Sequence, residues 1–157
     1  MMRPLTSLTV EDIKMSLRAI VQDFHKEFRE QLVAVVVYGS YARGMAKPGS
    51  DVDLLVVVRG LPRDWQGLHR LEDKWARRSQ RLGKRFQIML ASPEDVEDSV
   101  EWAAPLMLEI YDAHVIIFDH DGFFRICVMH MERIMKERGI RKRKPGVWEV
   151  PEHAVSP

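Results

Sequence analysis

Two runs of apolar, mostly β-branched residues constrain the fold of this chain more than any other feature. They cover residues 32–38 (LVAVVVY) and 52–58 (VDLLVVV). Short apolar runs of this composition are typical of strands that other elements cover on both faces. The segment between them, 39–51, is rich in Gly, Ser and Pro. It is predicted to be a loop with at most one helical turn.

Helical patterns alternate with the predicted strands along the chain. Apolar residues at three- and four-residue spacing predict a helix over 9–31, with Thr9 as its N-cap. Further helices are expected over about 65–82, from Ser92 onward, over 105–111 and over 123–138, and further strands over 86–90 and 115–118. This alternation predicts an α/β or α+β fold, in which helices flank a mixed β-sheet.

The length of 157 residues suits a single domain, 1–157. We expect a core over about 5–91, a helical extension over 92–139, and an irregular tail over 140–157 in which Trp148 packs back onto the domain. No apolar run approaches the ~20 residues of a membrane span, and the first residues lack a secretory pattern. A cytoplasmic protein without membrane partners is therefore expected.

The single cysteine, Cys127, can form no disulfide within the chain, and its apolar neighbours predict a buried, unreactive thiol. The net charge of +1 conceals a basic segment at 59–85, an acidic one at 92–121 and a basic one at 133–144. Each can be a solvated surface. The basic residues of 138–144 leave binding to RNA or to an acidic partner open.

The loop between the two apolar runs carries the residues suited to chemistry. Gly39 and Ser40 end the first run, where glycine lets the backbone approach a ligand and backbone amides can face an anion. Asp51 and Asp53 alternate at the start of the second run and therefore project together. Two adjacent carboxylates repel each other and require a cation, and Mg²⁺ prefers oxygen ligands. The alternative is a simple turn followed by a solvent-facing strand start.

The joint pattern, GSYARG followed by SDVDLLV, resembles the nucleotidyltransferase superfamily typified by DNA polymerase beta, and specifically its small prokaryotic and archaeal members, the minimal nucleotidyltransferases. The motif covers about 36–58, and weaker similarity extends over most of the chain. The resemblance implies a polymerase-beta-like fold that binds a nucleoside triphosphate, expected to be ATP, at Gly39 and Ser40. Asp51 and Asp53 would be the catalytic ligands of Mg²⁺ (or Mn²⁺).

The implied reaction transfers a nucleoside monophosphate to a hydroxyl group, and pyrophosphate leaves. Arg43 is a candidate contact to the triphosphate, or else a surface residue of the loop. Ser50 is a candidate contact to a phosphate, or else the cap of the turn before Asp51.

One position departs from the superfamily pattern, which usually has a third carboxylate on a later strand. The matching strand here, 85–90, offers only Gln87, whose amide can ligate through oxygen but cannot accept a proton at neutral pH. The nearest acids, Glu94 and Asp95, are expected to cap a helix instead.

Two hypotheses follow for the function. The first is an Mg²⁺-dependent nucleotidyltransferase that acts on a hydroxyl of a protein, an RNA or a small molecule. The second, implied by the family, is a catalytically weak or inactive nucleotide-binding module that pairs, as antitoxins do, with a helical partner protein. The roughly 65 residues outside the core are too few for a large acceptor-binding domain. The acceptor is therefore expected on another chain or on a second copy.

Overall fold

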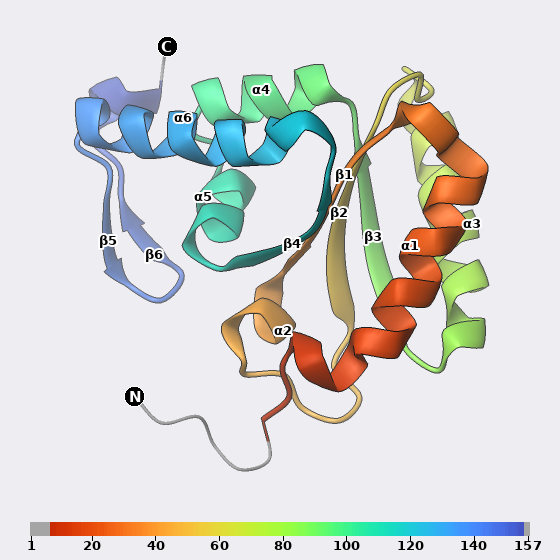
Figure 1. Cartoon of the computed structure of the whole chain (residues 1–157). Coiled ribbons are helices and arrows are strands. Elements are labelled where there is room, and N and C mark those ends of the chain that lie inside the picture. The colour runs from red at the N-terminus through yellow and green to blue at the C-terminus, as the bar shows by residue number, and fades with distance from the viewer. Residues whose placement is uncertain (1–6, 156–157) are drawn as a thin grey trace.

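The computed structural model describes residues 7–155 and is built around a four-stranded sheet (Figure 1). Its strands are β1 (Leu32–Tyr38), β2 (Val52–Val58), β3 (Phe86–Ala91) and β4 (His114–Asp119). They lie in the order β3-β2-β1-β4. β1 is antiparallel to β2 and to β4, whereas β2 and β3 are parallel. The predicted mixed sheet is confirmed, and β3 and β4 form its two edges.

Six α-helices of the described residues flank this sheet. They are α1 (Lys14–Phe28), α2 (Gly39–Arg43), α3 (Trp65–Ser79), α4 (Pro93–Glu101), α5 (Pro105–Asp112) and α6 (Phe123–Arg138). Short 3-10 turns extend several of them: Val10–Ile13 and Arg29–Gln31 flank α1, and Gln80–Leu82 follows α3. The helix predicted from Ser92 onward is present as α4, and Ser92 caps it: its side chain accepts a hydrogen bond from the backbone N–H of Asp95.

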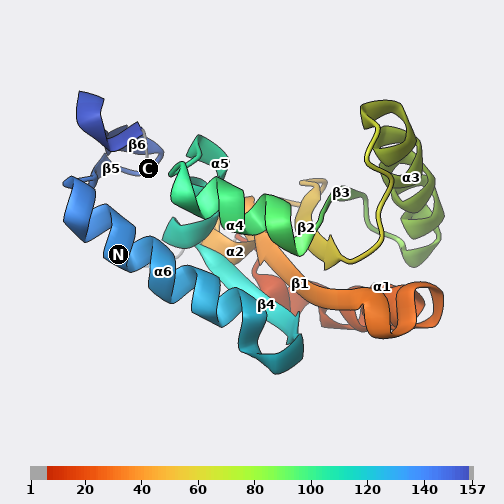
Figure 2. The same cartoon turned by 90° about the horizontal axis from the view of Figure 1, so that it is seen from above.

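The helices form two layers, one on each face of the sheet. α1 and α3 cover one face, while α4, α5 and α6 cover the other (Figure 2). β1 is buried along its whole length because successive side chains enter opposite cores: Val35 and Val37 pack under α1 and α3, and Ala34 and Val36 under the C-terminal helices. None of the helices in residues 7–155 is long and apolar enough to cross a membrane.

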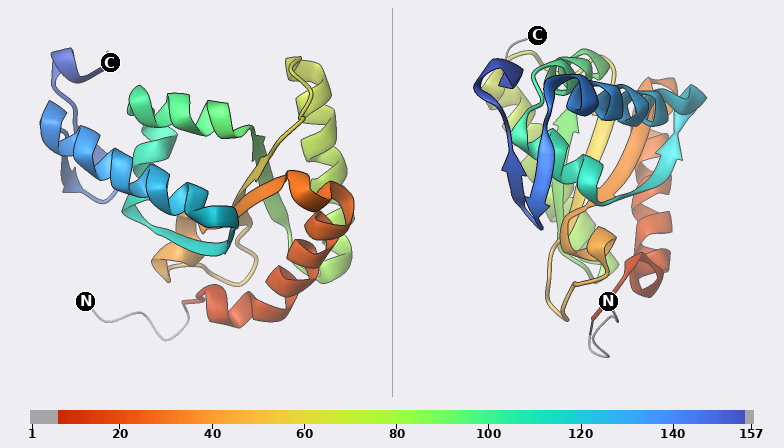
Figure 3. Two further views of the ribbon diagram at one scale, coloured as in Figure 1. Left: turned by 45° about the horizontal axis from the view of Figure 1, so that its top comes forward. Right: turned by 90° about the vertical axis from the view of Figure 1, so that its left-hand side faces the viewer.

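The irregular tail predicted from residue 140 is wrong. Strands β5 (Arg141–Lys144) and β6 (Val147–Glu149) form an antiparallel hairpin beside α5 and α6 (Figure 3). Gly146, at φ +76°, makes the tight turn possible, and Arg143 Nε lies 2.8 Å from Glu149 Oε2 across the hairpin. Trp148 is partly buried against the C-terminal core, as predicted.

Candidate active site

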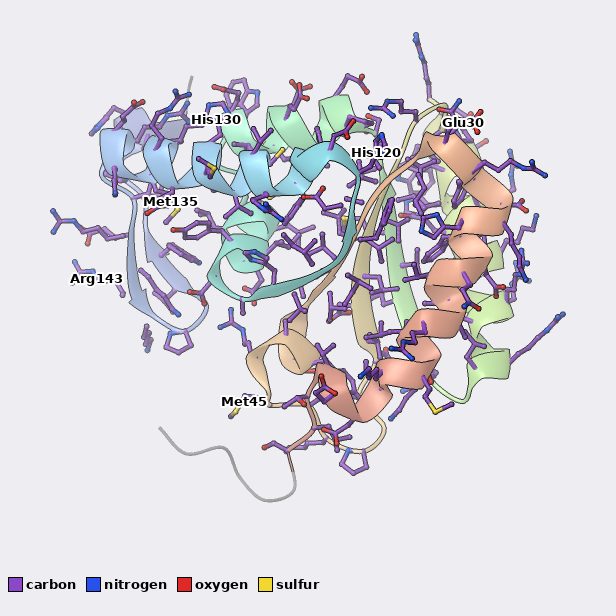
Figure 4. All side chains as sticks on the ribbon, viewed as in Figure 1. Glu30, Met45, His120, His130, Met135 and Arg143 are labelled. Atoms are coloured by element: carbon purple, nitrogen blue, oxygen red, sulfur yellow. The ribbon has the colours of Figure 1, made fainter. Side chains whose placement is uncertain are left out.

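The candidate site lies where β1 ends and β2 begins, at the end of the sheet where Met45 follows α2 (Figure 4). Asp53 pairs with Tyr38 of β1 on one side and with Gln87 of β3 on the other. Directly paired residues project from the same face of a sheet. Asp53, Tyr38 and Gln87 therefore form a row across three strands, on the face that also carries α4, α5 and α6.

The backbone of Gly39 lies directly against the carboxylate of Asp53. It has φ +73°, a conformation that side chains rarely adopt, and it begins α2 directly after β1. A Cβ atom at this position would overlap Oδ2 of Asp53. The sequence predicted glycine here for close approach to a ligand. The structure adds a second reason, because only glycine leaves room for the Asp53 carboxylate.

The two aspartates are close enough to influence each other. Burial, followed by the charge of Asp51, raises the pKa of Asp53 above its ordinary value of 3.8. Asp51 is more exposed, and its Oδ1 lies 3.0 Å from Nε of Arg85. Burial, followed by the charges of Asp53 and Glu72, raises the pKa of Tyr38 to about 12. The site therefore carries excess negative charge, which a bound cation would relieve.

This donor set fits a magnesium ion better than a soft transition metal. Residues 7–155 contain no group of three or more His, Cys, Asp or Glu side chains that could hold a metal. Mg²⁺ usually takes only one or two carboxylates and completes its shell with water and substrate phosphates. Asp51 and Asp53 are the residues that would hold it.

The other predicted nucleotide contacts have partners within the chain. Ser50 closes the turn from Lys47: its Oγ accepts from the Lys47 N–H at 2.9 Å, and its own N–H donates to the Lys47 carbonyl at 2.9 Å. The turn-cap alternative is therefore present for Ser50. Arg43 donates to Oδ2 of Asp112 at 2.7 Å and to Oε1 of Glu109 at 3.1 Å. Contacts of Arg43 and Ser50 to a nucleotide stay predictions.

Glu94 and Asp95, which follow the C-terminal end of β3, lie too far from Asp53 to replace the missing carboxylate. Glu94 and Asp95 lie in the first turn of α4, after Ala91. Ala91 is four residues beyond Gln87 on the same strand, or about 13 Å away at ~3.3 Å per residue. Their predicted role at the helix start is confirmed, and Gln87 is the strand residue directly beside Asp53.

Sequence reasoning missed Glu72, an acid that borders the site from α3. A cleft of about 520 Å³ is lined by Asp51, Tyr38 and Gln87 and also by Glu72. The side chain of Glu72 is 15% exposed, and its Oε2 accepts a hydrogen bond from the Leu90 N–H at 2.8 Å. No local motif marks this residue, because its place depends on how α3 packs against β3.

The sheet and the carboxylate pair at the start of β2 lie within the part of the chain that a family model matches. The sequence profile of the nucleotidyltransferase domain matches residues 16–121, which include Gly39, both aspartates and Gln87. The chain belongs to this nucleotidyltransferase family and is thus a nucleotidyltransferase by class.

Two candidate protein adenylyltransferases of the archaeon Methanocaldococcus jannaschii are similar in sequence. One is 32% identical over 121 residues, which cover 76% of this chain and 81% of that protein. The other is 36% identical over 52 residues, which cover 31% of this chain and 52% of that protein. The longer match spans most of both chains and agrees with the archaeal resemblance in the sequence.

Solved structures of low sequence identity share the fold. A chain from a toxin–antitoxin complex crystallised with AMP-PNP has a TM-score of 0.51 at 14% identity, covering 77% of this chain and 91% of its own length. A chain from the complex of a tri-AMPylated HEPN toxin with the MNT antitoxin of Shewanella oneidensis has a TM-score of 0.50 at 13% identity, with coverages of 81% and 92%. These likenesses support the polymerase-beta-like fold.

Proposed function

We propose that this protein is an Mg²⁺-dependent adenylyltransferase that transfers AMP from ATP to a hydroxyl group of a protein. The observation that carries the proposal is the Asp51–Asp53 pair, in which Asp53 is packed against Gly39 at the start of α2. The similarity to candidate protein adenylyltransferases over 121 residues supports ATP as donor and protein as acceptor.

In this proposal, different residues bind the triphosphate and the metal ion. The backbone of Gly39 and Ser40 lies where the chain turns from β1 into α2, and it would face the triphosphate. Asp51 and Asp53 would hold Mg²⁺, or Mn²⁺ in its place. When bound, such an ion neutralises phosphate charge and orients the reacting oxygens.

In the proposed step, the acceptor oxygen forms a bond to the α-phosphorus of ATP. The bond from that phosphorus to the bridging oxygen of the β-phosphate breaks, and pyrophosphate leaves. Gln87 is an amide and cannot take the proton of the acceptor hydroxyl. The proposal therefore gives this proton to solvent water, and it predicts a slow enzyme.

A second candidate function is a nucleotide-binding antitoxin that pairs with a helical partner and turns over little. Gln87 beside Asp53 favours it, because a general base contributes roughly 10²–10⁴-fold to proton-transfer reactions. The fold shared with chains of toxin–antitoxin complexes is compatible with this function.

The labelled phosphate of ATP distinguishes the two functions. The protein is incubated with Mg²⁺, a cell extract and ATP labelled at either the α- or the γ-phosphate. Transfer of AMP labels a protein from α-labelled ATP only. Binding of ATP without a labelled protein in any extract would favour the antitoxin-like module, and label from the γ-phosphate would contradict both.

Gln87→Glu tests whether the amide limits the reaction, since it replaces one nitrogen by oxygen at constant shape. The transfer rate should rise about tenfold or more, because the new carboxylate lies beside Asp53 and can accept a proton. Gln80→Glu is the matched control, since Gln80 lines the same cleft from the turn after α3. An equal gain in both variants would show a general charge effect and refute the role of position 87.

A further inference from the structure

A groove lies beside β3, an edge strand of the sheet, and its other wall is formed by residues of α3. It belongs to the 520 Å³ cleft, whose lining also includes Asp51. The strand contributes residues 86–89 as one wall. The helix side contributes Glu72 and Asp73, with Gln80 just beyond the helix end.

The strand wall offers unpaired main-chain groups. The Val52 N–H donates to the Arg85 carbonyl, so the main-chain groups of Arg85, Gln87 and Met89 face β2. Those of Phe86, Ile88 and Leu90 alternate with them and point outward. Leu90 confirms this direction, since its N–H donates to Glu72 on α3. The outward N–H and C=O of Ile88 have no partner within residues 7–155.

The side chains of the same residues are turned into the core. Ile88 is 6% exposed and Phe86 is 3% exposed, and both pack under α1 and α3. Phe86 and Ile88 therefore offer main chain rather than side chains to the groove, whereas Gln87 and Met89, which are less buried, also line it. An edge of this kind binds an extended peptide as an additional strand, about 4.8 Å away.

We propose that this groove binds the acceptor protein as an extended segment, which adds to the sheet beside Ile88 and directs a hydroxyl side chain toward Asp51 and Asp53. The inference rests on the proposed transfer to a protein hydroxyl. Glu72 occupies the edge at Leu90, so added pairing is confined to the half of β3 nearest the aspartates.

The charged residues that line the groove indicate which charge an acceptor segment should carry. Glu72, Asp73 and Asp51 line it, together with Arg85, which is paired with Asp51, and His69, whose Nδ1 lies 3.1 Å from Oε1 of Glu72. An incoming segment is therefore expected to carry Lys or Arg beside its hydroxyl residue, because opposite charge favours encounter and register. A helical segment would leave the Ile88 main chain unpaired and is not expected in this groove.

The test uses the full chain labelled with ¹⁵N and the acetylated hexapeptide Thr-Val-Tyr-Val-Lys-Thr as probe, without nucleotide. Peptide addition should shift the Ile88 amide resonance and slow its hydrogen exchange at least about tenfold, whereas the exchange of Gln87 and Met89, already paired with β2, should stay the same. No change at Ile88 with millimolar peptide would overturn the proposal.

Two sets of N-methylated peptides separate strand addition from side-chain binding. Methyl groups on alternate amides block one edge of an extended peptide and leave the other free. One set should bind about tenfold more weakly or worse, and the other should bind within about threefold of the parent. Equal binding of both sets would refute pairing with β3.

A protein variant tests the charge of the groove. Asp73→Asn should weaken binding of this peptide about threefold and should not affect a peptide with Gln in place of Lys. Asp98→Asn on α4, also an exposed helical acid, is the matched control and should bind both peptides normally. An ATP titration that follows the Gly39 and Ser40 amides without peptide reports on the proposed function separately.

Discussion

Two pairs of acidic residues lie close to the loop 39–51, and they differ in how their charge is balanced. Glu109 and Asp112, on α5, are bound by Arg43 from α2, and Asp112 also lies 2.6 Å from Nζ of Lys142. For Asp51 and Asp53, the one basic partner within residues 7–155 is Arg85, whose side chain is 71% exposed and contacts Asp51.

The difference appears in the pKa values of the two buried members. Burial alone would raise the pKa of Asp112, but hydrogen bonds from Lys142 and Arg43 outweigh it and lower the pKa. Burial and Asp51 raise the pKa of Asp53. The negative charge of Glu109 and Asp112, the α5 pair, is therefore balanced by basic residues of the chain itself. Through Arg43 and Lys142 this pair joins the motif loop to the C-terminal hairpin. The carboxylates of Asp51 and Asp53, the β2 pair, repel each other, and a bound cation would remove this repulsion.

The largest expected effect concerns catalysis. Asp53→Asn should lower AMP transfer at least about a hundredfold, the scale of losing one preorganised electrostatic group in an active site. Asp112→Asn is the same chemical change in the balanced pair and should stay within about threefold of wild type. Initial rates with α-labelled ATP measure both. Comparable losses in two folded variants would abolish the distinction between the pairs.

Alanine substitutions at two glycines distinguish the effect of backbone strain from the effect of contact with Asp53. Gly39→Ala and Gly44→Ala both place a side chain at φ near +70°, which costs about 1–2 kcal/mol in each case. Only at position 39 would the new Cβ overlap the Asp53 carboxylate, since the nearest atom at position 44 is Cγ2 of Thr9, at 3.5 Å.

Gly39→Ala should therefore lose transfer activity about tenfold or more beyond Gly44→Ala, at similar or lower stability. Thermal unfolding and initial rates report the two effects. If the two variants have equal activity, the close approach of Gly39 to Asp53 has no catalytic role.

The strands and the motif were predictable because their signals are local. The continuous β-branched runs predicted β1 and β2 to the residue, and Gly139, at φ +69°, ends α6 as expected for a glycine C-cap. The spacing of Gly39, Asp51 and Asp53 was likewise sufficient to place them together.

The missed features depend on contacts between distant segments. Strand β5 consists of four basic residues with no apolar alternation, and ion pairs such as Lys142 with Asp112 hold it beside α5. Glu72 and Leu90 are joined only because the fold brings α3 beside the far end of β3. The sequence left two roles open for Arg43, a contact to the triphosphate or a surface residue of the loop. Nothing near it in the sequence indicates its partners on α5.

A smaller effect concerns stability. Arg43→Gln removes the ion pair to Glu109 and one of the two ion pairs of Asp112, and should lower the free energy of unfolding by about 1–2 kcal/mol. The side chains of these two acids are 38% and 10% exposed. Arg85→Gln removes an exposed contact to Asp51 and should cost less than about 0.5 kcal/mol. Chemical denaturation measures both. Equal costs would mean that the α5 pair is no more structural than the β2 pair.

The smallest effect is a difference of sign in the dependence of stability on pH. The lowered pKa of Asp112 gives stability that is present above about pH 3.8 and is lost as the pH falls through the folded pKa. The raised pKa of Asp53 acts in reverse: its contribution is complete below 3.8 and is lost as the pH rises through the folded pKa.

At pH 7, Asp112→Asn should therefore be less stable than wild type, and Asp53→Asn should be more stable, each by about 0.5 kcal/mol after allowance for solvent screening. The Asp53 difference should vanish toward pH 3, because the raised pKa makes this carboxylate neutral there. The Asp112 difference should begin to shrink only below about pH 3.8, as the pH falls toward the lowered pKa of the folded state. Urea unfolding at pH 3, 5 and 7 measures the trend. Mg²⁺ should stabilise wild type and not Asp53→Asn, since a cation relieves only the repulsion that the chain leaves unbalanced. A stabilising effect of Asp112→Asn at pH 7 would reverse the assignment of the two pairs.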